Sequence, residues 1–316
     1  MSATLPSIIE SGLSSSTNNK YHTGWNRWLN WSGRNSEVNK LPANPFFVAL
    51  FLNYILTEFK TKGALVSAFY GIRWGHTISG FSSPTDHPFV QLAFEGCQRM
   101  ITSQGKHPKE PISPQILKML YNKYGQDNNN LFDLRFVVMC FLGFAGFFRI
   151  EELLSVQLKN VNFSSTHLEI TIEKSKCDQH RDGHIVYVSK LNSEYCPVKV
   201  LDRFLCLCKI DRTDENCFII PRLFKTKTGY NASKNLGISY TTARDIFAKK
   251  LKECDLRSEL YGLHSLRSGG ATAAASNNVD DRLISKHGRW KSDKSKNGYI
   301  KDTVEKRLQI SKSLGL

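Results

Sequence analysis

The sequence predicts a mainly α-helical protein of two domains, with a small β-hairpin in the second domain. A chain of 316 residues is long enough for two domains that each have a core. Two short β-branched segments, residues 167–174 and 184–190, stand out among helical patterns. In the N-terminal third, apolar residues recur at helical spacing in four segments, residues 21–31, 45–59, 64–78 and 89–101.

Composition indicates where the domains begin and end. The first 20 residues are rich in Ser and Asn, so we expect residues 1–20 to form a flexible arm. The four helical patterns place the first domain at residues 21–104. Residues 105–112 are polar and contain a glycine and two prolines, which is typical of a linker. The second domain is then expected at residues 113–316.

Aromatic residues follow one face of the first expected helix. Tyr21, Trp25, Trp28 and Trp31 recur at helical spacing. Such a stripe is more often part of a core than a nucleic-acid contact, and we expect it to be core. Pro45 suits the first turn of the next helix.

The second domain begins with strong helix signals. Ser113 and Pro114 fit an N-cap and a first-turn proline, and Gly125 is the expected stop. A second helix is expected from about Leu131 into the segment around Arg149. The two β-branched segments predict a β-hairpin, with the dipeptide Asp182-Gly183 as a turn signal. Further helices are expected at residues 197–208, 240–254, 280–286 and 302–314, and through His264.

The charge of the chain indicates a polyanionic partner. The formal net charge is +15 and the pI is about 9.4. Residues 1–105 hold 8 Lys+Arg and 5 Asp+Glu, whereas residues 106–316 hold 35 and 23. A soluble, lysine-rich surface without such a partner is the alternative that charge alone leaves open.

Cysteine usage and hydropathy indicate a soluble intracellular protein. The 8 cysteines show no Cys-x-x-Cys pair and no histidine at zinc spacing, so we expect buried free thiols and no metal site. The N-terminus has no signal-peptide pattern, and no run of apolar residues reaches membrane-spanning length. We therefore expect no membrane partner.

Four C-terminal residues carry groups suited to phosphoryl transfer on DNA. His264 and Arg267 form a helical His-x-x-Arg pair, and Trp290 and Tyr299 follow among basic residues. Taken singly, Arg149, His264 and Tyr299 also fit roles outside catalysis. Arg149 could be a buried ion-pair partner of Glu151 or Glu152, His264 a core histidine and Tyr299 a surface aromatic.

In order and spacing, these residues resemble the tyrosine recombinase family, which includes phage integrases, Cre and Xer recombinases and the recombinases of eukaryotic Crypton and DIRS-type elements. Arg149 matches the family's Arg-x-x-Glu-Leu box, and His264 and Arg267 match its His-x-x-Arg box. Trp290 stands at its His-or-Trp position and Tyr299 at the nucleophile, 9 residues later. The resemblance implies a helical core-binding domain and a mixed α+β catalytic domain that together clamp DNA.

The matched residues have complementary expected roles. Tyr299 is the nucleophile, while Arg149 and Arg267 grip the two non-bridging phosphate oxygens and stabilise developing charge. His264 donates to an oxygen or accepts the phenolic proton, and the sequence does not decide between these. Trp290 packs the site and offers its indole N–H, and Glu152 orients its neighbours.

The family also implies a hairpin lysine that protonates the leaving 5′ oxygen. Lys176 and Lys174 are both candidates, and the Ser-Lys-Cys context favours Lys176. His287 is an alternative acid or base that we expect to be structural or to contact DNA.

One stretch departs from the family pattern. Ser268 stands where many bacterial members have His. The pair Gly269-Gly270 then opens a helix, which we expect to permit close backbone packing.

By analogy with the family, we expect a site-specific recombinase that forms a 3′-phosphotyrosyl intermediate and needs no cofactor. Its partners would be double-stranded DNA and three further copies, in a homotetramer on two DNA sites with the C-terminal helix docked on a neighbour. A domesticated DNA-binding protein without recombination activity and a type IB topoisomerase are the alternatives. The tripeptide Gly288-Arg289-Trp290 resembles the recombinases of eukaryotic mobile elements, which favours a nuclear site of action. In a prokaryote the protein would be cytoplasmic.

Overall fold

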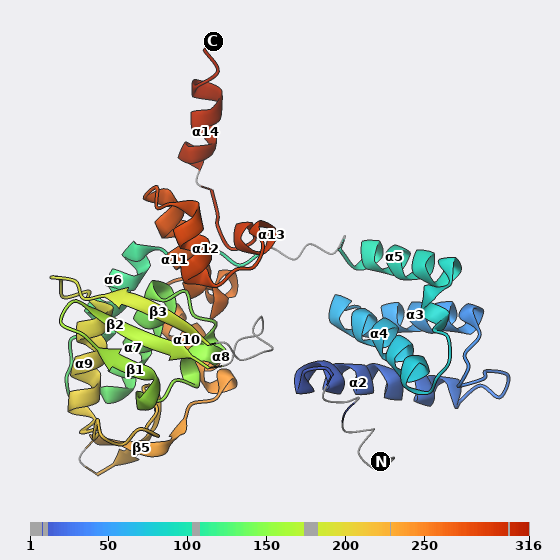
Figure 1. Ribbon diagram of the computed structural model, residues 1–316, viewed down its shortest axis with the longest axis horizontal. Helices are drawn as coiled ribbons and strands as arrows, with labels where there is room; N and C mark the ends of the chain where they lie inside the picture. Colours follow the sequence, from blue (N-terminus) through green and yellow to red (C-terminus); the bar gives the residue numbers. More distant parts are fainter. Residues whose placement is uncertain are drawn as a thin grey trace. The chain divides into compact units, whose positions relative to one another are not determined.

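The chain divides into two compact units, which Figure 1 shows in sequence colours. The computed structural model describes residues 8, 12–102, 108–173, 183–227, 229–302 and 304–315. Unit 1 covers residues 1–107 and unit 2 covers residues 108–316. The division therefore falls within the segment 105–112 where a linker is expected.

In its described residues, unit 1 contains four long α-helices, labelled α2 to α5, and a short 3-10 turn. The first helix begins earlier than expected, because the Ser14 hydroxyl accepts the Thr17 N–H at 3.3 Å and caps it. The prediction of a flexible arm is consequently wrong for residues 15–20. The other helical predictions for this unit are confirmed to within two residues. The elements are α2 (Ser15–Ser32), α3 (Pro45–Phe59), α4 (Lys62–Ile78), η2 (Pro84–Asp86) and α5 (Pro88–Thr102).

The three tryptophans of the aromatic stripe on α2 belong to the core of unit 1, as expected, whereas Tyr21 is partly exposed and stacks on Tyr70. Trp28 is fully buried, and Trp25 and Trp31 pack against the same cluster. A buried histidine joins α4 to the segment before α3. His76 Nδ1 donates to the Ile72 carbonyl at 2.8 Å, and Nε2 accepts the Ala43 N–H at 2.9 Å. Burial lowers the pKa of His76 below its usual value.

The helices that open unit 2 position the first arginine. Ser113 caps α6 (Pro114–Tyr124) and Gly125 ends it, as predicted. Helix α7 (Leu131–Ala145) stops before Arg149, and a short α8 (Ile150–Leu154) follows. The expectation that Arg149 lies inside a helix is wrong, because Phe147 adopts a positive φ of 46° and breaks the chain direction. Arg149 is instead the N-cap of α8.

The described part of unit 2 also contains two antiparallel sheets. The expected hairpin is confirmed: β2 (His167–Ile172) pairs with β3 (His184–Ser189), and Ile170 faces Val186. Alternate residues of β2 point into the core. A third strand, β1 (Val161–Phe163), and a separate pair, β4 (Pro221–Thr226) and β5 (Gly229–Gly237), were not expected.

The C-terminal helices carry the remaining site residues. The glycine pair of α11 allows close packing, as expected: a Cβ on Gly269 would lie 2.1 Å from the Ile112 carbonyl oxygen, and one on Gly270 would lie 2.2 Å from that of Phe144. Helix α13 was not expected. The elements are α9 (Pro197–Leu207), α10 (Tyr240–Lys252), η4 (Ser258–Leu260), α11 (His264–Ser276), α12 (Asp281–Gly288), α13 (Asp293–Asn297) and α14 (Val304–Lys312).

The cysteines of the described residues are free thiols, but not all are buried. Cys140 and Cys196 lie in the core, whereas Cys206 is exposed. Cys206 follows two core residues of α9, and the helical turn carries it to the outer face, so its expected burial is wrong. Among the described residues there is no His, Cys, Asp and Glu cluster of metal-binding size. None of the described helices combines the length and apolarity needed to span a membrane.

Candidate active site

Arg267 lies at the centre of the candidate site. Its side chain is fully buried, and it donates from Nη1 to the Phe147 carbonyl and from Nη2 to the Gly288 carbonyl. Burial, with Arg149 and Arg289 nearby, lowers the pKa of Arg267 to about 10. The guanidinium therefore stays charged at neutral pH and is fixed in direction by two backbone carbonyls.

Arg149 and Glu152 form an ion pair at the start of α8. Arg149 Nη1 lies 2.5 Å from Glu152 Oε1, and the Arg149 backbone N–H donates to Oε2 at 3.1 Å. Glu152 is buried, whereas the Arg149 side chain keeps 16% of its surface exposed. The ion pair between Arg149 and Glu152 that the sequence suggested is present, and the Arg149 side chain still reaches solvent.

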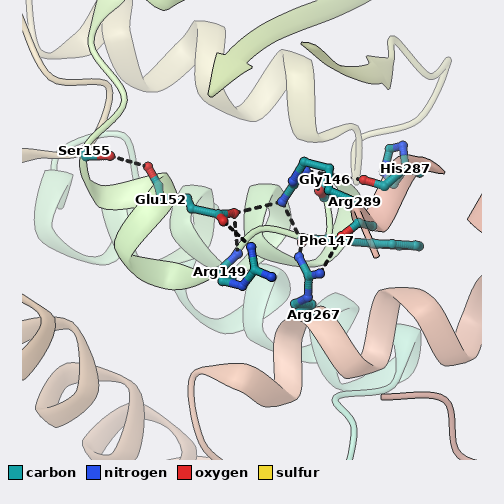
Figure 2. Close-up of polar contacts among 9 residues, drawn as sticks. Gly146, Phe147, Arg149, Glu152, Ser155, Arg267, His287 and Arg289 are labelled. Atoms are coloured by element: carbon teal, nitrogen blue, oxygen red, sulfur yellow. Dashed lines mark hydrogen bonds and ion pairs between the residues drawn. The ribbon is translucent and has the colours of Figure 1, made fainter. Parts of the chain in front are cut away.

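A third arginine joins the cluster, and the sequence interpretation missed it. Arg289 Nη2 donates to Glu152 Oε2 at 2.8 Å and to the Phe147 carbonyl at 3.1 Å. Figure 2 shows Glu152 between Arg149 and Arg289, and the Phe147 carbonyl facing Arg267. The only signal in the sequence is that Arg289 stands next to Trp290.

Tyr299 and Trp290 cover the Arg267 guanidinium. The Cζ atom of Arg267 lies 4.5 Å from the Trp290 ring centre and 5.0 Å from that of Tyr299. The two rings are 5.4 Å apart. The Tyr299 carbonyl accepts from the Ser268 hydroxyl, so the residue that departs from the family pattern fastens the Tyr299 backbone to α11.

His264 lies on the same helix as Arg267. His264 is the first residue of α11 and is exposed, three residues before the buried Arg267. Lys174 and Lys176 lie outside the described residues.

His287 has the surroundings of a structural residue. Its Nε2 lies 2.8 Å from the Ala145 carbonyl, and its ring meets the Phe147 ring edge-on at 4.6 Å. Burial lowers the pKa of His287, which keeps the ring neutral with Nε2–H as the donor to Ala145. Of the two roles that we expected, structural or DNA-contacting, this geometry favours the structural one.

The fold is that of DNA recombinases of known structure. XerH in a post-cleavage complex with palindromic difH substrate aligns with a TM-score of 0.64 and 13% identity, over 94% of this chain and 79% of that one. A lambda integrase dimer bound to a COC′ core site aligns with a TM-score of 0.59 and 14% identity, over 93% and 74%.

Sequence comparison gives the family. An integrase/recombinase XerD homolog of Selenomonas ruminantium is 28% identical over 298 residues, which cover 92% of this chain and 83% of that protein. The model of the phage integrase family matches residues 114–306, more than half of the chain. The chain belongs to the phage integrase family, the tyrosine recombinases, which cleave and rejoin DNA.

Proposed function

We propose that this protein is a site-specific recombinase in which Tyr299 attacks the scissile phosphate of double-stranded DNA. The convergence of Tyr299 with Arg267 carries the proposal, because the ring of the nucleophilic tyrosine lies 5.0 Å from Cζ of a guanidinium that backbone carbonyls hold in place. Arg149 adds a second guanidinium to the same cluster. The XerH and lambda integrase structures contain DNA substrates, which supports a duplex as the partner here.

The proposed step exchanges one phosphodiester for another. Tyr299 gives up its phenolic proton, its Oη bonds to phosphorus, the bond to the 5′ oxygen breaks, and that oxygen takes up a proton. Arg149 and Arg267 grip the non-bridging oxygens as their charge grows, which stabilises the transition state more than the bound substrate. The 3′-phosphotyrosyl bond keeps the bond energy, so a free 5′ hydroxyl can reverse the step without a nucleotide cofactor.

Three further residues complete the proposed site. Lys176 protonates the 5′ oxygen, with Lys174 as the alternative, and His264 at the exposed start of α11 transfers a proton or donates to a phosphate oxygen. Trp290 Nε1 and Arg267 Nε are buried donors without an acceptor among the described residues. A phosphate oxygen that enters the cluster would give them one.

We further propose a homotetramer on two DNA sites. Helix α14 exposes apolar side chains that a globular monomer would bury: Val304 is 67% exposed and Ile310 71%. The described surface also holds an apolar groove lined by Ile185, Tyr187 and Leu283. Docking of α14 in this groove of a neighbouring copy would cover these apolar side chains.

The proposal is tested by trapping the covalent intermediate. With nicked suicide substrates built from candidate recombination sites, the wild-type protein should form a denaturant-resistant complex with DNA. Tyr299→Phe should lose this complex entirely and keep its DNA binding, because only the attacking oxygen is removed. Equal covalent product from the variant would reject Tyr299 as nucleophile.

The same assay separates the alternatives. DNA binding with no covalent product from the wild type would favour a domesticated binding protein. Relaxation of supercoils by a monomer, without strand exchange between two sites, would favour a topoisomerase. A fluorescent fusion tests the nuclear site of action, which stays a prediction from the sequence.

A further inference from the structure

Arg289 holds the two acceptors on which the other arginines depend. Its Nη2 donates both to Glu152 Oε2, at 2.8 Å, and to the Phe147 carbonyl, at 3.1 Å. Glu152 is the partner of Arg149, and the Phe147 carbonyl is the acceptor of Arg267 Nη1. The buried Arg289 guanidinium thus bonds to one acceptor of Arg149 and to one acceptor of Arg267 (Figure 2).

The surroundings of Arg289 make this arrangement specific. Its side chain is only 3% exposed, and the Glu152 carboxylate offsets the cost of burying this charge. Arg289 and Phe147 both have positive φ values, 57° and 46°. Such values are unfavourable for residues with a side chain and persist only where the surrounding contacts impose them.

The division of Glu152 between two arginines matters for phosphate binding. A carboxylate engaged by Arg149 alone would neutralise the guanidinium that the phosphate needs and draw it towards α8. Arg289 binds Oε2, while Arg149 Nη1 approaches Oε1. Arg289 therefore withdraws part of the carboxylate charge from Arg149 and fixes the plane of the carboxylate.

We propose that Arg289 is a positioning residue for strand cleavage: it holds Glu152 and the Phe147 carbonyl so that Arg149 and Arg267 present their guanidinium groups to the scissile phosphate. This inference rests on the proposed function. It goes beyond that function, because it assigns a role to Arg289, which acts through Glu152 and the Phe147 carbonyl and does not itself contact the phosphate.

The test compares two DNA substrates in single-turnover cleavage at saturating DNA. One carries an ordinary scissile phosphate, and the other a methylphosphonate, which lacks one negative charge and so needs less stabilisation by arginine. Arg289→Met keeps much of the apolar stem and removes the charge. It should cleave the phosphate about 100-fold more slowly than wild type, the loss expected when a catalytic group is misplaced by about 1 Å.

On the methylphosphonate, the loss for Arg289→Met should shrink to less than about 10-fold, as it should for Arg149→Ala, because arginine charge contributes less there. Arg282→Met is the matched control, since Arg282 lies on α12, the helix that Arg289 follows as C-cap, and its side chain is 81% exposed. This variant should cleave both substrates at the wild-type rate.

An equal loss on both substrates would show that Arg289 serves only the fold, and no loss on either would also overturn the inference. If Arg289→Met does not fold, as judged by its thermal unfolding, Arg289→Lys carries the comparison. It keeps the charge but replaces the guanidinium fork by a single ammonium, so the same substrate pattern is expected with a smaller loss. Failure of the wild type to form any covalent product would instead reject the proposed function.

Discussion

At the scale of single residues, Lys176 is the proposed acid of the cleavage step. A substrate with sulfur in place of the bridging 5′ oxygen releases a thiolate, which needs far less protonation than an alkoxide. Lys176→Ala should therefore cleave ordinary DNA poorly and the sulfur-substituted DNA well. Single-turnover rates on the two substrates measure the rescue.

Arg267→Ala is the reference for that comparison. It should stay slow on both substrates, because the transition-state charge remains unsupported. Rescue of Lys174→Ala in place of Lys176→Ala would move the acid by two residues along the chain. Rescue of neither lysine variant would place the acid elsewhere, with His287 next to be tested.

Sequence reasoning reached those site residues that have characteristic neighbours along the chain. Arg267 and Tyr299 could be predicted because the spacing of the motif is itself a pattern. Arg289 has no such pattern, since its partners Phe147 and Glu152 lie 142 and 137 residues away in the sequence. Its importance is visible only after folding brings α8 and the end of α12 together.

At the scale of elements, His76 should make unit 1 sensitive to acid. Burial lowers the pKa of folded His76 below the usual value of about 6.5, so the unfolded chain binds the proton more readily. Its contribution to stability is complete above about pH 6.5 and declines as the pH falls below it. Protonation would also convert Nε2 from the acceptor of the Ala43 N–H into a donor.

Hydrogen exchange of the intact protein measures this effect. Amides of α4 should exchange faster at pH 5.5 than the intrinsic rate change accounts for, and His76→Gln should reduce the difference. His87 is exposed, and His87→Gln serves as the control that keeps the wild-type response. An unchanged pH response in His76→Gln would contradict the prediction.

Elements with strong end signals could be predicted, and short ones could not. The cap Ser113 and the stop Gly125 define α6 in the sequence as they do in the structure. Helix α13 has only 5 residues, too few for a helical period to show. Helix α7 ends before Arg149 because the chain turns sharply there: Phe147 has a φ of 46°, and a Cβ on Gly146 would lie 2.1 Å from the Phe148 ring.

At the scale of the whole molecule, α14 should control assembly on DNA. Replacing the exposed Val304 and Leu308 by Ser removes apolar surface that the single chain leaves uncovered. The double variant should unfold at the wild-type temperature, bind DNA mainly as smaller species and exchange strands poorly. Light scattering of DNA complexes measures the stoichiometry. Lys312→Ser on the same helix is the matched control, and a wild-type stoichiometry for the double variant would contradict the tetramer.

The charge distribution predicts how binding to DNA depends on salt. Residues 106–316 carry 35 Lys+Arg against 23 Asp+Glu, and residues 282–316 alone carry 10 against 3. Each phosphate that these side chains neutralise releases a condensed counterion, so the affinity falls with a log–log slope of about −0.9 per phosphate. For an enzyme that clamps a duplex, the slope should be steeper than about −3. Residues 113–316 alone should retain much of the DNA binding, since residues 1–105 carry only 8 basic against 5 acidic side chains.

Fluorescence anisotropy over a range of salt concentrations measures the slope for the full chain and for residues 113–316. A shallower slope for the full chain would mean that fewer than about four phosphates are neutralised, and the clamp would then be wrong.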